Sequence, residues 1–263
     1  IGLYVSGTAF GGMIGRVATG ALTEIVSWRG ALATIGVVDL IMAFVFLMLL
    51  PPSRNFTTRK GLSARVHLAA WYEHLRTPYL PALFLVGFLA LGGFMAVYNY
   101  VGFRLSAPPY DLNHAQIGLI FFAYLGGVAA SSLAGALADH VGRGPVLLVG
   151  ALIFLVGLLL TLMHTLPMII AGIVVVTIGF FVVHSIASGW VGKLATRDKG
   201  HASSLYLLAY YAGASLLGSA GGWVWRTGGW DAIVGYCAGL LGIVFLIALM
   251  LFHASAKTPK VAA

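Results

Sequence analysis

Eight long apolar runs restrict what this chain can fold into more than any other feature. They cover about residues 1–23, 29–50, 80–104, 115–138, 145–164, 167–190, 202–224 and 231–253. A run of roughly 18 or more apolar residues is long enough to cross a bilayer as an α-helix. Closed barrels are the other structure that satisfies every backbone group in hydrocarbon, but these runs are too long and too uniform for barrel strands. The sequence therefore predicts an all-α, polytopic membrane protein.

Composition and charge agree with a membrane environment. The chain is 60% apolar with a mean hydropathy of +0.98, and only 8% of its residues are charged, against about 25% in ordinary soluble proteins. The net charge of +8 is dispersed over the connecting segments and forms no continuous basic face, as nucleic-acid binding would require. We therefore expect the lipid bilayer, and not nucleic acid, as a partner.

The distribution of basic residues predicts the orientation in the membrane. Most of the 15 lysines and arginines lie in segments 51–79, 139–144, 193–199 and 254–263. Cytoplasmic loops carry an excess of such residues, so both ends of this chain are predicted to be cytoplasmic. Residue 1 is an isoleucine inside an apolar run, and we interpret the chain as a fragment.

An internal repeat predicts the organisation of the chain. One ungapped shift of 202 residues aligns Tyr4 with Tyr206, Gly11 with Gly213, Gly20 with Gly222 and Trp28 with Trp230. A repeat unit then contains six helices, and four helices are expected to precede residue 1. Residues 1–50 are predicted to be the last two helices of an N-terminal bundle, 51–79 a cytoplasmic linker, and 80–263 a C-terminal six-helix bundle with a short tail.

The linker contains apolar residues at helical spacing, namely Leu62, Val66, Ala69 and Ala70. This pattern predicts an amphipathic helix on the cytoplasmic face. A flexible basic tether is the alternative.

The stretch GALADHVGRG, residues 135–144, places Asp139, His140 and Arg143 between two apolar runs. Together with two six-helix repeats and a basic linker, it resembles the major facilitator superfamily. That family's signature, between helices 2 and 3 and again between helices 8 and 9, is Gly-x-x-x-Asp-Arg-x-Gly-Arg-Arg/Lys. Gly135, Asp139, Gly142 and Arg143 fit it, whereas His140 and Gly144 depart from it. The resemblance implies that the chain contains helices 5–12 of twelve and that this stretch is a cytoplasmic gate. The alternative is a short turn that is charged only because it is exposed to water.

The resemblance implies a secondary active transporter. Such proteins bind a small molecule near the bilayer midplane between the two repeats and rock around it. We find no phosphate-binding loop, metal-ligand pair or Ser-His-Asp arrangement in the sequence, so no enzyme activity, catalytic residue, cofactor or metal is expected. We predict proton-coupled efflux of small hydrophobic or cationic compounds from the inner membrane of a bacterium, by a protein that is monomeric at full length. An importer of a small metabolite or organic anion, and a non-transporting remnant, remain alternatives.

A second motif lies in the first apolar run. Antiporters of the family carry Gly-Pro-x-x-Gly-Gly in helix 5, and this chain has Gly7, Thr8, Gly11 and Gly12 there, with threonine in place of proline. The resemblance implies exchange transport, but glycines also serve plain helix packing.

Two ionisable side chains lie inside apolar runs, where each costs roughly 2.5–3.5 kcal/mol. Asp39 is near the centre of its run and is a candidate for proton coupling, or else a structural hydrogen-bonding group. Arg16 is a candidate for contact with substrate or for an outer gate, or else reaches the membrane interface.

The expected cavity lining consists of in-helix polar and aromatic residues: Tyr98, Asn99, His184, Tyr210 and Tyr211. For His184 the alternative is a helix-to-helix hydrogen bond, and Tyr206 is early enough in its run to anchor at the interface. An aromatic, weakly polar cavity suits hydrophobic or cationic amphiphiles better than sugars.

Overall fold

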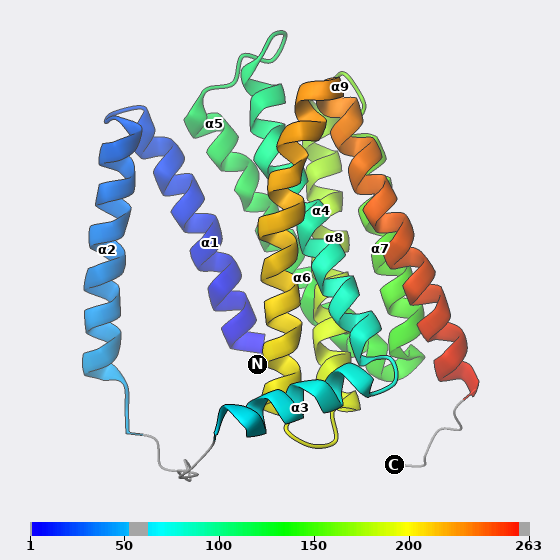
Figure 1. Ribbon diagram of the computed structural model, residues 1–263. Helices are drawn as coiled ribbons and strands as arrows, with labels where there is room; N and C mark the ends of the chain where they lie inside the picture. The colour runs from blue at the N-terminus through cyan, green and yellow to red at the C-terminus, as the bar shows by residue number, and fades with distance from the viewer. Residues whose placement is uncertain (1, 53–62, 258–263) are drawn as a thin grey trace.

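The computed structural model describes residues 2–52 and 63–257, apart from the side chains of 2–6, 8, 9 and 255–257. These residues form helices and no strand (Figure 1). The helices are α1 Gly2–Thr23, α2 Trp28–Leu49, α3 Ala64–Arg76, α4 Leu80–Ser106, α5 His114–Leu119, the 3-10 turn η1 Ile120–Phe122, α6 Ala123–Val141, α7 Arg143–Leu160, α8 Leu166–Leu194 and α9 Lys199–Lys257.

Each predicted apolar run lies on a helix, which confirms the all-α prediction. Within residues 2–52 and 63–257, six segments are long and apolar enough to cross a membrane: α2, α4, the continuous segment His114–Val141, α7, α8 and α9. The last contains two of the predicted runs, because the backbone leaves the helical conformation at Gly228 and at Gly229, where φ is 59°. The chain reverses direction there (Figure 1). Trp230 follows this reversal just as Trp28 opens α2 after the preceding turn, so the two tryptophans of the repeat occupy equivalent places.

Helices α4 and α6–α9 pack into one bundle, in which α4 lies against α9, and α8 against α6 and α7. Lipid offers little hydrophobic drive for helix association, so such contacts depend on close van der Waals packing through small residues. At Gly179 a Cβ atom would overlap the backbone of Phe154, and at Gly157 it would overlap the backbone of Val176. Helices α7 and α8 therefore touch backbone to backbone.

Helices α1 and α2 lie at one side of this bundle. The main neighbour of α1 is α5, and α2 packs on α1 and stands apart from the rest (Figure 1). Of the side chains in α2, only that of Ala31 is buried.

Helix α3 crosses one end of the bundle, which we call the α3 end; the opposite end, where α5 begins, is the α5 end (Figure 1). The face of α3 that packs on the bundle carries His67, Ala70, Trp71 and His74, while Val66 and Ala69 are exposed.

The predicted helix is therefore present, Ala70 of the predicted apolar set is packed, and Leu62 lies outside the described residues. Two imidazoles that the apolar pattern did not include also face the bundle, because each has a partner there. Nδ1 of His67 lies 2.8 Å from Nε2 of His201, and Nε2 of His74 donates to the carbonyl of Asp198 at 3.2 Å.

We expect Gly179→Ala to destabilise the protein by about 1–3 kcal/mol, the usual cost of overpacking, because the added methyl group must push α7 away from α8. Thermal unfolding in detergent measures this. Gly235→Ala is the matched control, because its Cβ would meet no atom within 4 Å. Equal melting temperatures for the two variants would contradict the backbone contact.

Candidate transport cavity

A cavity of about 260 Å³ lies among α4, α6, α8 and α9, and we call it the aromatic chamber. Its lining is Leu91, Phe94, Met95, Tyr124, Phe180, Phe181, His184, Tyr210, Tyr211 and Ala214. Three of the five predicted lining residues, His184, Tyr210 and Tyr211, therefore lie together in it.

The rings of the aromatic chamber contact one another across helices. Phe94 of α4 stacks on Phe180 of α8 with centroids 4.0 Å apart, and His184 lies 4.5 Å from Tyr210 of α9. Phe180 and His184 are one helical turn apart, so their side chains lie next to each other on the face of α8 that lines the cavity. The wall is thus a continuous aromatic surface made by three helices.

His184 also makes the helix-to-helix hydrogen bond considered as its alternative role. Its Nδ1 lies 3.0 Å from the hydroxyl of Tyr206, which is only 1% exposed. The interpretation of Tyr206 as an interface anchor is therefore wrong. A Cβ at Gly87 would lie 2.8 Å from the Tyr206 ring, so the glycine leaves the space in which this ring is buried. The bond ties α8 to α9 beside the aromatic chamber.

Tyr98 and Asn99 do not line the aromatic chamber. Tyr98 is buried behind it, where its hydroxyl donates to Oγ1 of Thr177 at 2.7 Å, and Thr177 donates in turn to the carbonyl of Ile173. Asn99 is exposed on another face of α4. Consecutive residues of a helix point about 100° apart, so these two side chains cannot share one wall.

A second cavity, of about 720 Å³, extends towards the α3 end between α6, α8 and α9. We call it the serine vestibule, because Ser131, Ser132, Ser185, Ser188 and Ser203 line it. His184 lines both cavities, so they adjoin at this residue.

The motif residues Gly135, Asp139 and Arg143 line the serine vestibule at its outer rim. Asp139 forms ion pairs of 3.6 Å with Arg143 and with Lys193 of α8. As part of a cytoplasmic gate, Asp139 is also expected to face the start of the first helix at residues 1–5, whose side chains lie outside the described ones.

Gly142 and Gly144 of the motif are each required for a different structural reason. Gly142 has a φ of 94°, which favours glycine, and caps both α6 and α7. Helix α7 begins at Arg143, two residues before Pro145, where the sequence predicted it to start. A Cβ at Gly144 would lie 2.8 Å from Cα of Phe252. Close packing against α9 thus explains why a basic residue of the family signature is replaced here.

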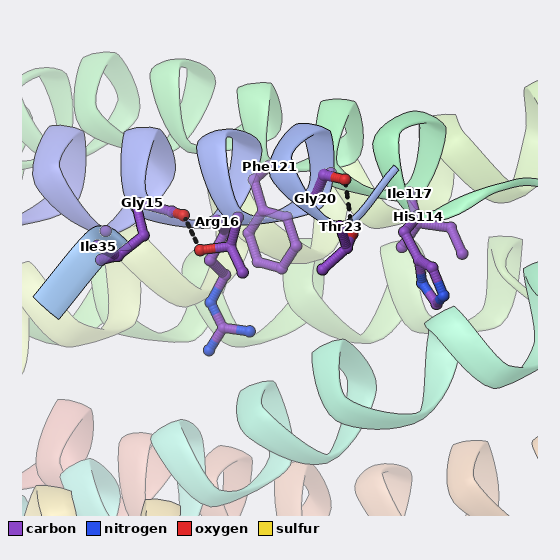
Figure 2. Close-up of a pocket in the computed structure, with 11 residues that line it drawn as sticks. Gly15, Arg16, Gly20, Thr23, Ile35, His114, Ile117 and Phe121 are labelled. Carbon is purple, nitrogen blue, oxygen red and sulfur yellow. Dashed lines mark hydrogen bonds between the residues drawn. The ribbon is translucent and has the colours of Figure 1, made fainter. Parts of the chain in front are cut away.

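Arg16 borders a third cavity of about 380 Å³, between α1, α2 and α5 (Figure 2). Its guanidinium carbon lies 4.8 Å from the centroid of the Phe121 ring. Arg16 therefore lies on the side of α1 that faces the main bundle.

The remaining candidates are not brought to these cavities. Asp39 is exposed on α2. In the motif resembling that of antiporters, a Cβ at Gly7, Gly11 or Gly12 would meet no described atom within 4 Å, and the side chain of Thr8 lies outside the described ones. The close contact of α1 lies further along, at Gly20.

The phenylalanines of the aromatic chamber, Phe94, Phe180 and Phe181, were not predicted from the sequence. A signal existed for Phe181, because it precedes His184 and Ser188 at helical spacing along α8, and such a stripe in an apolar helix indicates an interior face. Lys193 gave no such signal.

In the described part of the chain, no group of three His, Cys, Asp or Glu side chains could hold a metal ion.

Comparison with known proteins identifies the family. A sequence model of the Major Facilitator Superfamily matches residues 1–110 and 89–263. The uncharacterized MFS-type transporter YybF of Bacillus subtilis is 41% identical over 99% of this chain and 63% of its own length. The inner membrane transport protein YnfM of Escherichia coli is 42% identical over 94% of this chain and 59% of its own.

An uncharacterized transporter of Buchnera aphidicola is 38% identical over 95% of this chain and 60% of its own. The chain thus spans about three fifths of the length of these relatives. With its apolar helices and its match to this family, the chain belongs to the major facilitator superfamily of multi-pass membrane transporters.

Proposed function

We propose that this chain provides the substrate path of a secondary active transporter that exports small hydrophobic compounds in exchange for protons. The observation that carries the proposal is the junction of the aromatic chamber with the serine vestibule at His184. A substrate would bind among the rings and leave its site through the more polar vestibule. Alternating access would then expose the aromatic chamber to one side of the membrane at a time.

The lining supports hydrophobic substrates better than cations. No acidic side chain lines the aromatic chamber in the described residues, and its polar groups are one imidazole and the tyrosine hydroxyls. The volume of about 260 Å³ is slightly below the roughly 300–1,000 Å³ of typical ligand sites. We infer that the rest of the site comes from the N-terminal bundle, of which residues 1–50 are the last two helices, with 51–79 as the linker to the bundle 80–263.

The proposed setting is the inner membrane of a bacterium, with the α3 end in the cytoplasm and a monomer as the transporting unit. Arg76, Arg143, Lys193 and Lys199 all lie towards the α3 end, and the positive-inside rule supports this orientation. The name of YnfM, an inner membrane transport protein, agrees with it.

We expect Tyr211→Ala to raise the KM for efflux of a neutral aromatic dye about twofold to tenfold, the effect of losing one aromatic contact. Tyr211 lines the aromatic chamber and is 62% exposed, so its loss should leave the fold intact. Dye efflux from cells that express the complete coding sequence measures this. Leu246→Ala is the control, because Leu246 is equally exposed and lines none of the three cavities. Equal KM values for the two variants would exclude the aromatic chamber as the substrate site.

Collapse of the proton gradient should abolish dye efflux, and Asp39→Asn should have the same effect with the gradient intact. An acid inside a membrane span is costly and is therefore a functional candidate. Glu73→Gln, an exposed acid on α3, is the control and should transport normally. Efflux that survives gradient collapse would rule out antiport, and normal efflux by Asp39→Asn would remove this residue from coupling.

Arg16 favours a second candidate function, proton-coupled import of a small organic anion. A guanidinium that lines a cavity and lies 4.8 Å from the centroid of the Phe121 ring provides the charge that a carboxylate requires. In that case Arg16→Gln should lower benzoate uptake tenfold or more, because a hydrogen bond to a charged group is worth about 1.5–3 kcal/mol.

Arg29→Gln is the matched control for this test. Arg29 also lies over an aromatic ring, 4.3 Å from that of Trp28, but it lines none of the three cavities. Benzoate uptake that falls equally in both variants, or in neither, would reject the second candidate.

A further inference from the structure

At the α5 end of the bundle, one carboxylate joins α1 to α5. Glu24 lies in the turn after α1, and its Oε1 accepts hydrogen bonds from the backbone N–H of His114 at 3.0 Å and of Ala115 at 3.4 Å. These are the first two residues of α5. Helix α5 continues through η1 and α6 as one segment, His114–Val141, which forms a wall of both the aromatic chamber and the serine vestibule.

Glu24 is not the residue that caps α5 locally. Asn113 accepts from the N–H of Gln116, and the side chain of Gln116 accepts from the N–H of Asn113, which completes a capping box. The first N–H groups of a helix have no partner within the helix. Glu24 takes the two that the capping box leaves, so its particular effect is to connect α5 to α1. A negative charge is also favoured at a helix N-terminus.

The backbones of the two helices meet directly beside this contact. A Cβ at Gly20 would lie 2.7 Å from the carbonyl oxygen of His114, and a Cβ at Gly118 would lie 3.5 Å from the carbonyl oxygen of Arg16. Glycine at these positions removes the side chains that would hold α1 and α5 apart. The Glu24 bonds therefore hold α1 against α5 where the two backbones meet, and the third cavity, lined in part by Gly20 and Gly118, lies beside this contact.

The glycines of α1 that lie nearer the α3 end make no such contact in the described residues. A Cβ at Gly7, Gly11 or Gly12 would meet no described atom within 4 Å. The serine vestibule reaches Asp139 at that same end. In the described residues, the serine vestibule, which shares His184 with the aromatic chamber, thus lies towards the α3 end, and the close contact between α1 and α5 lies at the other end.

We propose that Glu24 is the latch of the gate at the α5 end: the aromatic chamber opens to that side when the Glu24 carboxylate releases the N-terminus of α5. This inference rests on the proposed transport by alternating access. It assigns Glu24 a positioning role, because the side chain acts through α5 and lines none of the three cavities.

The test follows access to the aromatic chamber from each side of the membrane. Ala214→Cys introduces a reporter in the chamber lining of the complete protein, and a membrane-impermeant maleimide is added to right-side-out or inside-out vesicles. Glu24→Ala should raise the labelling rate from the α5 end about twofold to fivefold, the effect of losing a carboxylate at an exposed helix N-terminus. Labelling from the α3 end should fall, because the two open states exchange population.

Gln116→Ala is the matched control, because it removes a bond of the same helix terminus that does not involve α1. It should leave both labelling rates unchanged. Cys237 is fully buried and reports on folding, since it stays unlabelled in a folded protein. If Glu24→Ala exposes Cys237, Glu24→Gln decides: an amide oxygen retains an acceptor without the charge, and a smaller shift in the same direction is expected.

Labelling from the two sides that changes equally, or does not change, would overturn the latch. A general loss of stability cannot imitate the expected result, because it raises access from both sides. The readout needs no substrate. A variant that shifts labelling in a protein that moves no dye would therefore reject the proposed function and leave the latch standing.

Discussion

Close contact between helix backbones, made possible by glycine, is the constraint on which the rest of the structure depends. In hydrocarbon the side chains of helices gain little by leaving lipid, so a bundle is held by dispersion forces over short distances and by buried hydrogen bonds. Gly157 and Gly179 bring α7 and α8 together in this way, and Gly213 brings α9 against the backbone of Phe88 in α4. With the helices fixed so closely, larger side chains such as Phe94 and Phe180 are confined to the spaces between them. The aromatic chamber is one of these spaces.

The same close packing explains the buried polar pairs around the aromatic chamber. A polar group in hydrocarbon requires a partner, and Tyr98 with Thr177, and His184 with Tyr206, supply partners across two pairs of helices. Each pair fixes the rotation of α8 relative to a neighbour. The wall of the aromatic chamber is therefore held by one bond that starts at the lining residue His184 and by one that lies behind the wall, at Tyr98.

The sequence predicted the helices well and their faces poorly, for physical reasons. A long apolar run specifies a membrane helix by itself, but a helix that is apolar all round gives no period from which to read its orientation. Tyr206 was thus misplaced at the interface, and Asn99 was grouped with Tyr98 although the two diverge. The face predicted for α3 consists of apolar residues alone, whereas His67 and His74 pack inward because each has a hydrogen-bond partner. The ion pair between Asp139 of α6 and Lys193 of α8 joins residues that are 54 positions apart in the sequence, and no local sequence pattern encodes it.

Alternating access requires that neither end of the path be closed too firmly. At the α3 end, the ion pairs of Asp139 with Arg143 and Lys193 are long and largely exposed, and such pairs contribute about 0–1 kcal/mol. At the α5 end, a carboxylate at an exposed helix N-terminus contributes about 0.3–1 kcal/mol. Both contacts are thus small, and a bound substrate or proton can shift a population only where the two states lie within a few kcal/mol of each other.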